Sequence, residues 1–88
     1  MTKLKKSPNV YSKKIRESWV LIREGSDHYI ELNDSAGFLW KHLDTPVSLE
    51  KLSTLLSKEY DIDIPKASQD AQEFINHLTK EKMIEEIE

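Results

Sequence analysis

The chain has 88 residues, of which 38% are hydrophobic and 33% are charged, and its formal net charge is −3. This composition is typical of one globular domain spanning residues 1–88 and excludes a disordered chain. The absence of Cys excludes disulfides and thiolate chemistry, and the longest apolar run, Trp19 to Ile22, is too short to cross a bilayer. The first ten residues lack the apolar segment of a secretory signal, so we expect a cytoplasmic protein.

The charge is distributed unevenly along the chain. Residues 1–16 carry six basic residues and no acidic one, whereas residues 17–88 carry seven bases and sixteen acids, a charge of −9. A basic arm on an acidic body suits nucleic acid or an acidic partner. Because chain termini are commonly unstructured, we expect residues 1–9 to form a disordered, solvated basic arm.

The first half of the chain has the composition of β-strands. Residues 18–23 and 28–32 are rich in β-branched and aromatic residues. Between them lies a turn at residues 24–27, in which Gly25 is free to adopt a positive φ. We therefore predict a hairpin of these two strands, joined by a less regular strand at residues 10–16.

Three helices are predicted after the hairpin, where the apolar period changes from two to about 3.6. The first begins at the capping residues Asn33 to Ser35 and ends before Pro46, and the second begins after Ser48. Pro65 belongs in the first turn of the third helix, where its missing N–H costs nothing. The apolar positions that define the three helical faces are Ala36, Leu39, Trp40, Leu43, Leu49, Leu52, Leu56, Tyr60, Ala67, Ala71, Phe74 and Leu78.

This order of elements predicts the fold class. Strands followed by helices favour α+β, here a three-stranded antiparallel sheet followed by a three-helix bundle, with a winged-helix-like shape.

The residue types that carry catalysis or bind metals are absent or wrongly spaced. His28, His42 and His77 contain no pair with helical ligand spacing, and there is no Cys to join them. The pair Asp61 and Asp63 lacks the third ligand and the glycine of a calcium loop. No glycine-rich phosphate loop or nucleophile elbow is present. We therefore expect no catalytic residues, no metal site, no cofactor and no enzyme activity.

The order and spacing of several segments resemble the PqqD-like family. These segments are Tyr29–Asn33, Ser35–Ala36, Leu39–Asp44, Ser48–Leu52, Glu59–Ile62 and Asp70–Leu78, the last being similar to the family's D-x-x-x-F-L-x-x-L helix. The strand Trp19–Arg23 fits the family's hairpin. The chain departs from the family at Lys82, where a Gly often precedes the final apolar pair.

The resemblance implies that the chain captures leader peptides. Such RiPP recognition elements serve pathways that make ribosomally synthesised, post-translationally modified peptides, including PQQ and lasso peptides. The leader is implied to add as a strand to the third β-strand and to lie against the third helix. A separate radical-SAM enzyme, cyclase or leader peptidase then acts on the core peptide, so the module itself is a non-catalytic peptide chaperone.

The expected site lies between the strand at 28–32 and the third helix. An uncovered sheet edge offers unpaired N–H and C=O groups to an extended peptide, and neighbouring side chains supply selectivity. The same helical spacing also suits core residues, and Phe74 and Leu78 are expected to pack mainly in the core. The expected peptide-binding residues are His28, Tyr29, Ile30, Glu31, Ala67, Asp70, Ala71 and Phe74.

Two other functions remain open from the sequence. A winged-helix DNA-binding protein would use the three helices, the hairpin and the basic arm, but Asp70, Glu73 and the acidic body repel phosphate. An adaptor subunit would dock a partner protein through the same sheet edge. That edge is compatible with a monomer or a strand-swapped dimer. We do not expect a membrane as a partner.

Overall fold

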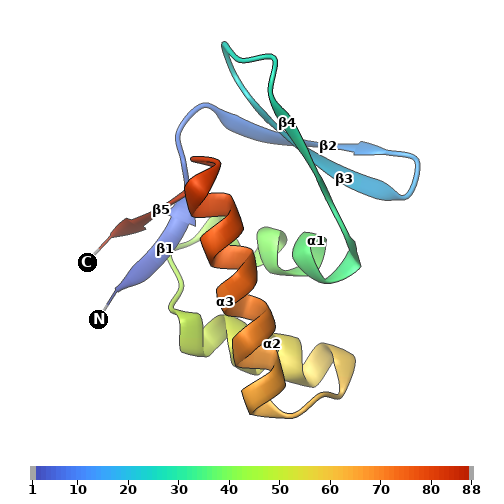
Figure 1. The fold of residues 1–88 in the computed structure, drawn as a ribbon, viewed down its shortest axis with the longest axis vertical. Helices are drawn as coiled ribbons and strands as arrows, with labels where there is room; N and C mark the ends of the chain where they lie inside the picture. Colours follow the sequence, from blue (N-terminus) through green and yellow to red (C-terminus); the bar gives the residue numbers. More distant parts are fainter. Residues whose placement is uncertain (1, 88) are drawn as a thin grey trace.

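Two small sheets and three helices make up the computed structural model, which describes residues 2–87 (Figure 1). The elements in chain order are β1 (Lys3–Lys6), β2 (Val10–Ile15), β3 (Ser18–Arg23), β4 (Tyr29–Leu32), α1 (Asp34–Lys41), the 3-10 helix η1 (His42–Asp44), α2 (Leu49–Tyr60), α3 (Ile64–Lys80) and β5 (Ile84–Ile87). The predicted α+β class is confirmed, with its three-stranded antiparallel sheet and its three helices.

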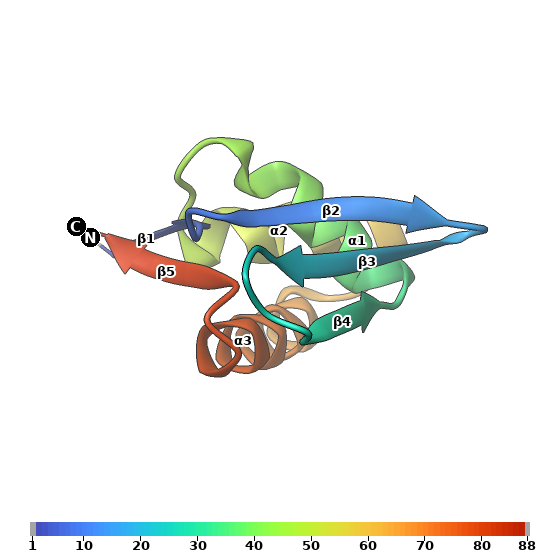
Figure 2. The same cartoon turned by 90° about the horizontal axis from the view of Figure 1, so that it is seen from above.

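The three-stranded sheet has the order β2-β3-β4 and packs one face on the helices. Leu21 of β3 is paired with Ile30 of β4, and both side chains enter the hydrophobic core. In β4, Ile30 and Leu32 are buried while Tyr29 and Glu31 are exposed, so this strand has one face toward the core and one toward solvent. Seen from above, β4 is the strand of this sheet that lies nearest α3 (Figure 2).

Each of the three α-helices begins at a side-chain cap. Asn33 accepts a hydrogen bond from the Ala36 backbone N–H at 2.8 Å, and Ser48 accepts one from Lys51 at 3.1 Å. The Asp63 carboxylate accepts from Lys66 at 2.9 Å, and Pro65 lies in the first turn of α3. These bonds satisfy backbone donors that a helix leaves without a partner in its first turn. Asn33 and Ser48, which predicted the starts of α1 and α2, are therefore the caps of those helices, whereas the Asp63 cap of α3 was not predicted.

The first and last strands form a second sheet that the sequence analysis did not predict. Lys3–Lys6 pairs antiparallel with Ile84–Ile87, and Leu4 also exchanges backbone hydrogen bonds with Val47. Leu4 is only 4% exposed because it packs into the core. The expected disordered arm at residues 1–9 is corrected accordingly: from Thr2 onward it is anchored by this strand, while Met1 lies outside the described residues.

The core lies between the three-stranded sheet and the helices. Its largest fully buried side chains are Leu21, Leu39, Leu43, Leu52, Leu56, Leu78 and Met83. Five of these lie on the predicted apolar helical faces, in keeping with the 3.6-residue period. Tyr60 was expected on the buried face of the second helix, but it closes the last turn of α2 and is 40% exposed.

Candidate functional site

A groove runs between β4 and α3. It encloses a cavity of about 500 Å³, lined on one side by residues of β4 and on the other by residues of α3, with the start of α1 at one end. Ile30, Leu39 and Phe74 are among its apolar lining residues and are nearly fully buried. The groove therefore has an apolar floor that belongs to the core itself.

The strand that borders this groove is the end strand of its sheet. β4 is hydrogen-bonded to β3 on one side, and no other strand within residues 2–87 pairs with it on the second side. An end strand of this kind leaves backbone N–H and C=O groups available to an added strand. The groove thus combines an open backbone edge with an apolar floor.

The rim of the groove on α3 is polar. Asp70, Glu73 and His77 lie at i, i+3 and i+7, which places them on one side of the helix beside the cavity. The Asp70 carboxylate accepts a hydrogen bond from the Lys66 ammonium at 3.1 Å. Glu73 and His77 are exposed, so their side chains are accessible to a bound molecule.

Four of the eight expected site residues lie together at the groove. Ile30 and Glu31 line it from β4, and Asp70 and Phe74 line it from α3. These residues lie together because β4 and α3 run in opposite directions on the two sides of the cavity (Figure 1). The groove is therefore built from the elements that the sequence had indicated.

The other four expected residues occupy different places. Ala67 and Ala71 have no exposed surface, because they face the core instead of the groove. The His28 ring contacts the Glu81 carboxylate just past the end of α3, so it joins the sheet to the helix beyond the cavity. Tyr29 is 65% exposed, and its side chain lies on the sheet face that points away from the helices.

Sequence reasoning missed several lining residues. Glu73 and His77 share the groove side of α3 with Asp70 and Phe74, and their spacings of three and seven residues from Asp70 were the signal for them. Asn33, Ser35 and Ala36 also line the cavity, because β4 leads directly into α1. Their contribution depends on the angle between strand and helix, which no local pattern specifies.

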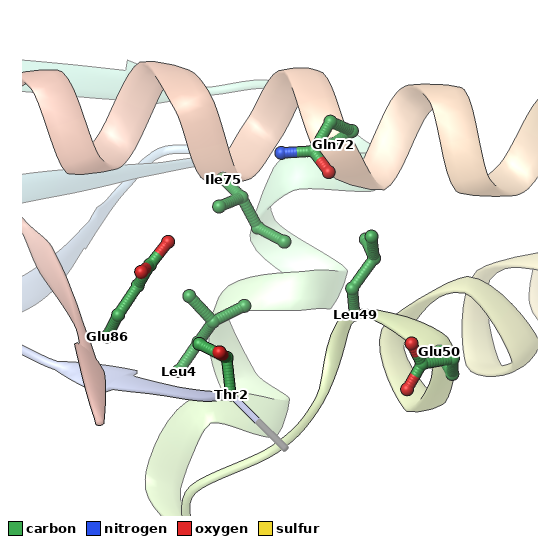
Figure 3. A pocket seen from close by; sticks show the side chains of 7 residues that line it. All are labelled: Thr2, Leu4, Leu49, Glu50, Gln72, Ile75 and Glu86. Atoms are coloured by element: carbon green, nitrogen blue, oxygen red, sulfur yellow. The ribbon is translucent and has the colours of Figure 1, made fainter. Parts of the chain in front are cut away.

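A second cavity of about 330 Å³ lies on the other side of α3, beside β1 and β5. Figure 3 shows Leu4, Leu49 and Ile75 gathered below the helix, with Gln72 above them and Glu86 and Glu50 at the sides. Leu4 and Ile75 are each 4% exposed, so this hollow is a shallow depression over the core. The neighbouring strand β1 is paired with β5 and bridged to Val47, so it offers less open backbone than β4.

A third cavity of about 310 Å³ lies where β3 and β4 meet α1 and the end of α2. Trp19, Phe38 and Tyr60 line it, and the Phe38 and Tyr60 rings meet edge to face at 5.9 Å. Partial burial raises the pKa of the Tyr60 hydroxyl, and the nearby carboxylates of Asp34 and Glu59 raise it further. The Tyr60 hydroxyl therefore stays protonated at neutral pH.

The part of the chain that the structure describes contains neither a metal-binding cluster nor a membrane-spanning helix. Residues 2–87 contain no group of three His, Asp or Glu side chains placed to bind a metal ion. Within the same residues, none of the helices is both long and apolar enough to span a membrane.

Comparisons with known proteins show first which fold this chain shares and then which family it belongs to. A solved structure described as TbiB1 in complex with the TbiA(beta) leader peptide has the same α+β fold. The match has a TM-score of 0.80 and 24% sequence identity, and it covers 92% of this chain and 94% of that chain. The family model described as coenzyme PQQ synthesis protein D (PqqD) matches residues 18–84. The chain belongs to the PqqD family. Comparison with curated protein sequences gave no match.

Proposed function

We propose that this chain is a leader-peptide recognition element that binds a precursor peptide as an added strand at β4. The observation that carries the proposal is the open edge of β4 beside the groove on α3. Strand addition supplies main-chain hydrogen bonds for affinity, and pockets for alternate side chains supply selectivity. Membership of the PqqD family and the fold shared with TbiB1, which was solved with a leader peptide, support this function.

The groove also indicates what the leader offers. Alternate side chains of an added strand point toward the helices, where Phe74, Ile30 and Leu39 present apolar surface. The rim on α3 carries Asp70 and Glu73. A leader that places one or two apolar side chains in the groove, with a basic residue near the rim, matches this lining.

In this proposal the chain is a non-catalytic partner of a separate enzyme. It holds the leader and presents the core peptide to a radical-SAM enzyme, a cyclase or a leader peptidase in the cytoplasm. The His28–Glu81 contact joins the sheet to α3 past the groove, so it bounds the length of peptide that lies between them.

The direct test is fluorescence anisotropy with the labelled leader of the precursor peptide encoded beside this gene. We expect a dissociation constant in the micromolar range or below, and at least about tenfold weaker binding of a scrambled leader, a difference of about 1.4 kcal/mol. Glu73→Ala should weaken leader binding, whereas Glu50→Ala, an exposed acid on α2 away from the groove, should not. Equal binding of the leader and the scramble would end the proposal.

Hydrogen exchange tests the position of the bound strand. The sheet has a second end strand, β2, which pairs only with β3. Leader binding at β4 should slow exchange of amides in Tyr29–Leu32 and leave Val10–Ile15 unchanged. Protection of β2 instead of β4 would contradict the proposed position even if the leader binds.

A further inference from the structure

The outer face of the three-stranded sheet, which points away from the helices, carries an apolar patch. Strand register and alternation place on it Tyr11, Lys13, Ile15, Ser18, Val20, Ile22, Tyr29 and Glu31. Tyr11 is 52% exposed, Ile15 48% and Tyr29 65%. The solvated face of an antiparallel sheet ordinarily presents polar residues, and a contiguous exposed apolar patch marks an interaction site.

This face is open in the structure. Figure 2 shows it toward the viewer, with α1 and α2 behind the sheet. Its residues border a hollow of about 690 Å³, lined by Ile15, Val20, Ile22 and Tyr29 among others. Glu31 borders both hollows, and none of the other residues of this hollow lines the groove between β4 and α3, so the outer face is a second surface that adjoins the proposed leader site at Glu31.

The register arranges the outer face in two rows that cross the sheet. One row consists of Lys13, Val20 and Glu31, and the other consists of Tyr11, Ile22 and Tyr29. Each row has an aliphatic residue on the central strand β3. The outer two residues of the first row, Lys13 and Glu31, are opposite in charge. The outer two residues of the second row are both tyrosines.

We propose that the outer face binds the outer face of a second copy of this chain around a two-fold axis parallel to β3. Such an axis places β2 of one copy over β4 of the other and keeps the rows aligned. Lys13 then lies over the second copy's Glu31, and Tyr11 lies over its Tyr29. On the central strand, Ile22 meets its own counterpart, as a two-fold interface requires, while Val20 is only 6% exposed and adds little to the contact.

The charges favour this occupant and this axis. Lys13 and Glu31 are two strand spacings apart in one sheet, about 10 Å, and neither has an ion-pair partner within residues 2–87. A two-fold axis that crossed the strands would stack β2 on β2 and β4 on β4, without this meeting of opposite charges. The face is therefore complementary to itself in one orientation.

Face-to-face packing leaves the leader site free. Two sheets pack about 10 Å apart through their faces and do not use their edges. The β4 edge of each copy remains open, at opposite sides of the sandwich, so a leader can still add to β4 in the dimer, although Glu31 borders both surfaces. The proposal stands even if leader capture fails, and the reverse also holds.

Sedimentation velocity across about 5–200 μM chain tests the dimer, with the higher concentrations chosen for a micromolar constant. We expect the weight-average mass to rise from 10.3 kDa toward twice that value. The double variant Tyr11→Thr, Ile15→Thr keeps β-forming side chains at two exposed positions, so it should stay folded and become monomeric. It should still bind leader, because neither residue lines the groove.

Reversing the charges of Lys13 and Glu31 tests whether the two copies pack around the proposed two-fold axis. Lys13→Glu places two acids against each other at both symmetric contacts and should weaken the dimer about tenfold. Glu31→Lys should weaken it similarly, and the double variant Lys13→Glu, Glu31→Lys should restore it. A mass of 10.3 kDa at every concentration overturns the proposal and leaves the face to a different protein. A dimer that both single variants leave unchanged overturns the two-fold arrangement.

Discussion

Gly37 of α1 lies directly against the indole ring of Trp19 in β3, and a Cβ added to Gly37 would come within 3.1 Å of Trp19 Cδ1. A glycine inside a helix costs about 1 kcal/mol relative to alanine. Here its missing side chain lets α1 approach the sheet at the end where β4 turns into the helix. This close approach fixes the angle between β4 and α1, on which one end of the proposed groove depends.

The effect of a substitution at Gly37 on the free energy of unfolding should therefore depend on the size of the new side chain. Gly37→Val forces the indole ring outward and should lower the free energy of unfolding by about 2 kcal/mol, as overpacked sites do. Gly37→Ala should change it by less than about 1 kcal/mol, because better helix propensity offsets the crowding. Urea unfolding followed by far-UV circular dichroism measures both. A valine variant as stable as the wild type would show that Trp19 moves aside without cost.

The elements that the sequence predicted are those with local signals. Asn33, Ser48 and Asp63 cap the three helices within a few residues of the groups they satisfy. The strand pair β1 and β5 was missed because its partners lie at opposite ends of the chain, Lys3 being paired with Ile87, so no local pattern links them. The two four-residue segments, Lys-Leu-Lys-Lys and Ile-Glu-Glu-Ile, carry little apolar pattern on their own.

The anchored N-terminal strand gives a prediction that separates it from a disordered arm. Leu4→Ala should lower the free energy of unfolding by about 2–4 kcal/mol, because Leu4 is buried in the core at 4% exposure. Lys3→Ala, at an exposed position in the same strand, should change it by no more than about 0.5 kcal/mol. Thermal and chemical unfolding measure the two effects. Equal, negligible effects would favour the disordered arm.

Lys82 adopts a left-handed backbone conformation with φ of 61°. This position follows the C-cap of α3, where glycine is favoured, and it is the one at which the family resemblance led us to expect Gly. Lys82→Gly should raise the free energy of unfolding by about 1 kcal/mol, because glycine adopts this conformation without steric cost. Lys82→Ala removes the same side chain but keeps the strain, so it should give no gain. An equal gain from both variants would trace the effect to the lysine side chain.

The candidate site could be predicted from the sequence only in part, because the rest depends on how the elements are oriented in space. A strand and a helix that border one groove were identified from their order, but the side of α3 that faces the groove depends on how the helix is rotated about its axis. Ala67 and Ala71 share a helical stripe with Phe74, yet both are fully buried, while Glu73 and His77 point to the cavity. Periodicity distinguishes buried from exposed faces, but it does not show which exposed margin borders a partner.

The contact between Lys6 and Asp44 links β1 to the 3-10 helix and gives a pH prediction. The Lys6 ammonium donates to Asp44 Oδ1 at 2.5 Å, and this hydrogen bond and the positive charge hold the pKa of the Asp44 carboxyl below its ordinary value. A carboxyl whose pKa is lower in the folded state adds stability at neutral pH, and this stability is lost as pH falls through the lowered pKa.

The difference in melting temperature between wild type and Asp44→Asn should therefore be present at neutral pH and disappear in acid. It should also shrink in 1 M salt, because Asp44 is exposed and salt screens such pairs. Lys6→Met should cost more than Asp44→Asn, since the Lys6 ammonium also lies 4.6 Å from the centroid of the Trp40 ring. A difference between wild type and Asp44→Asn that stays constant from neutral pH into acid would exclude the ion pair as its cause.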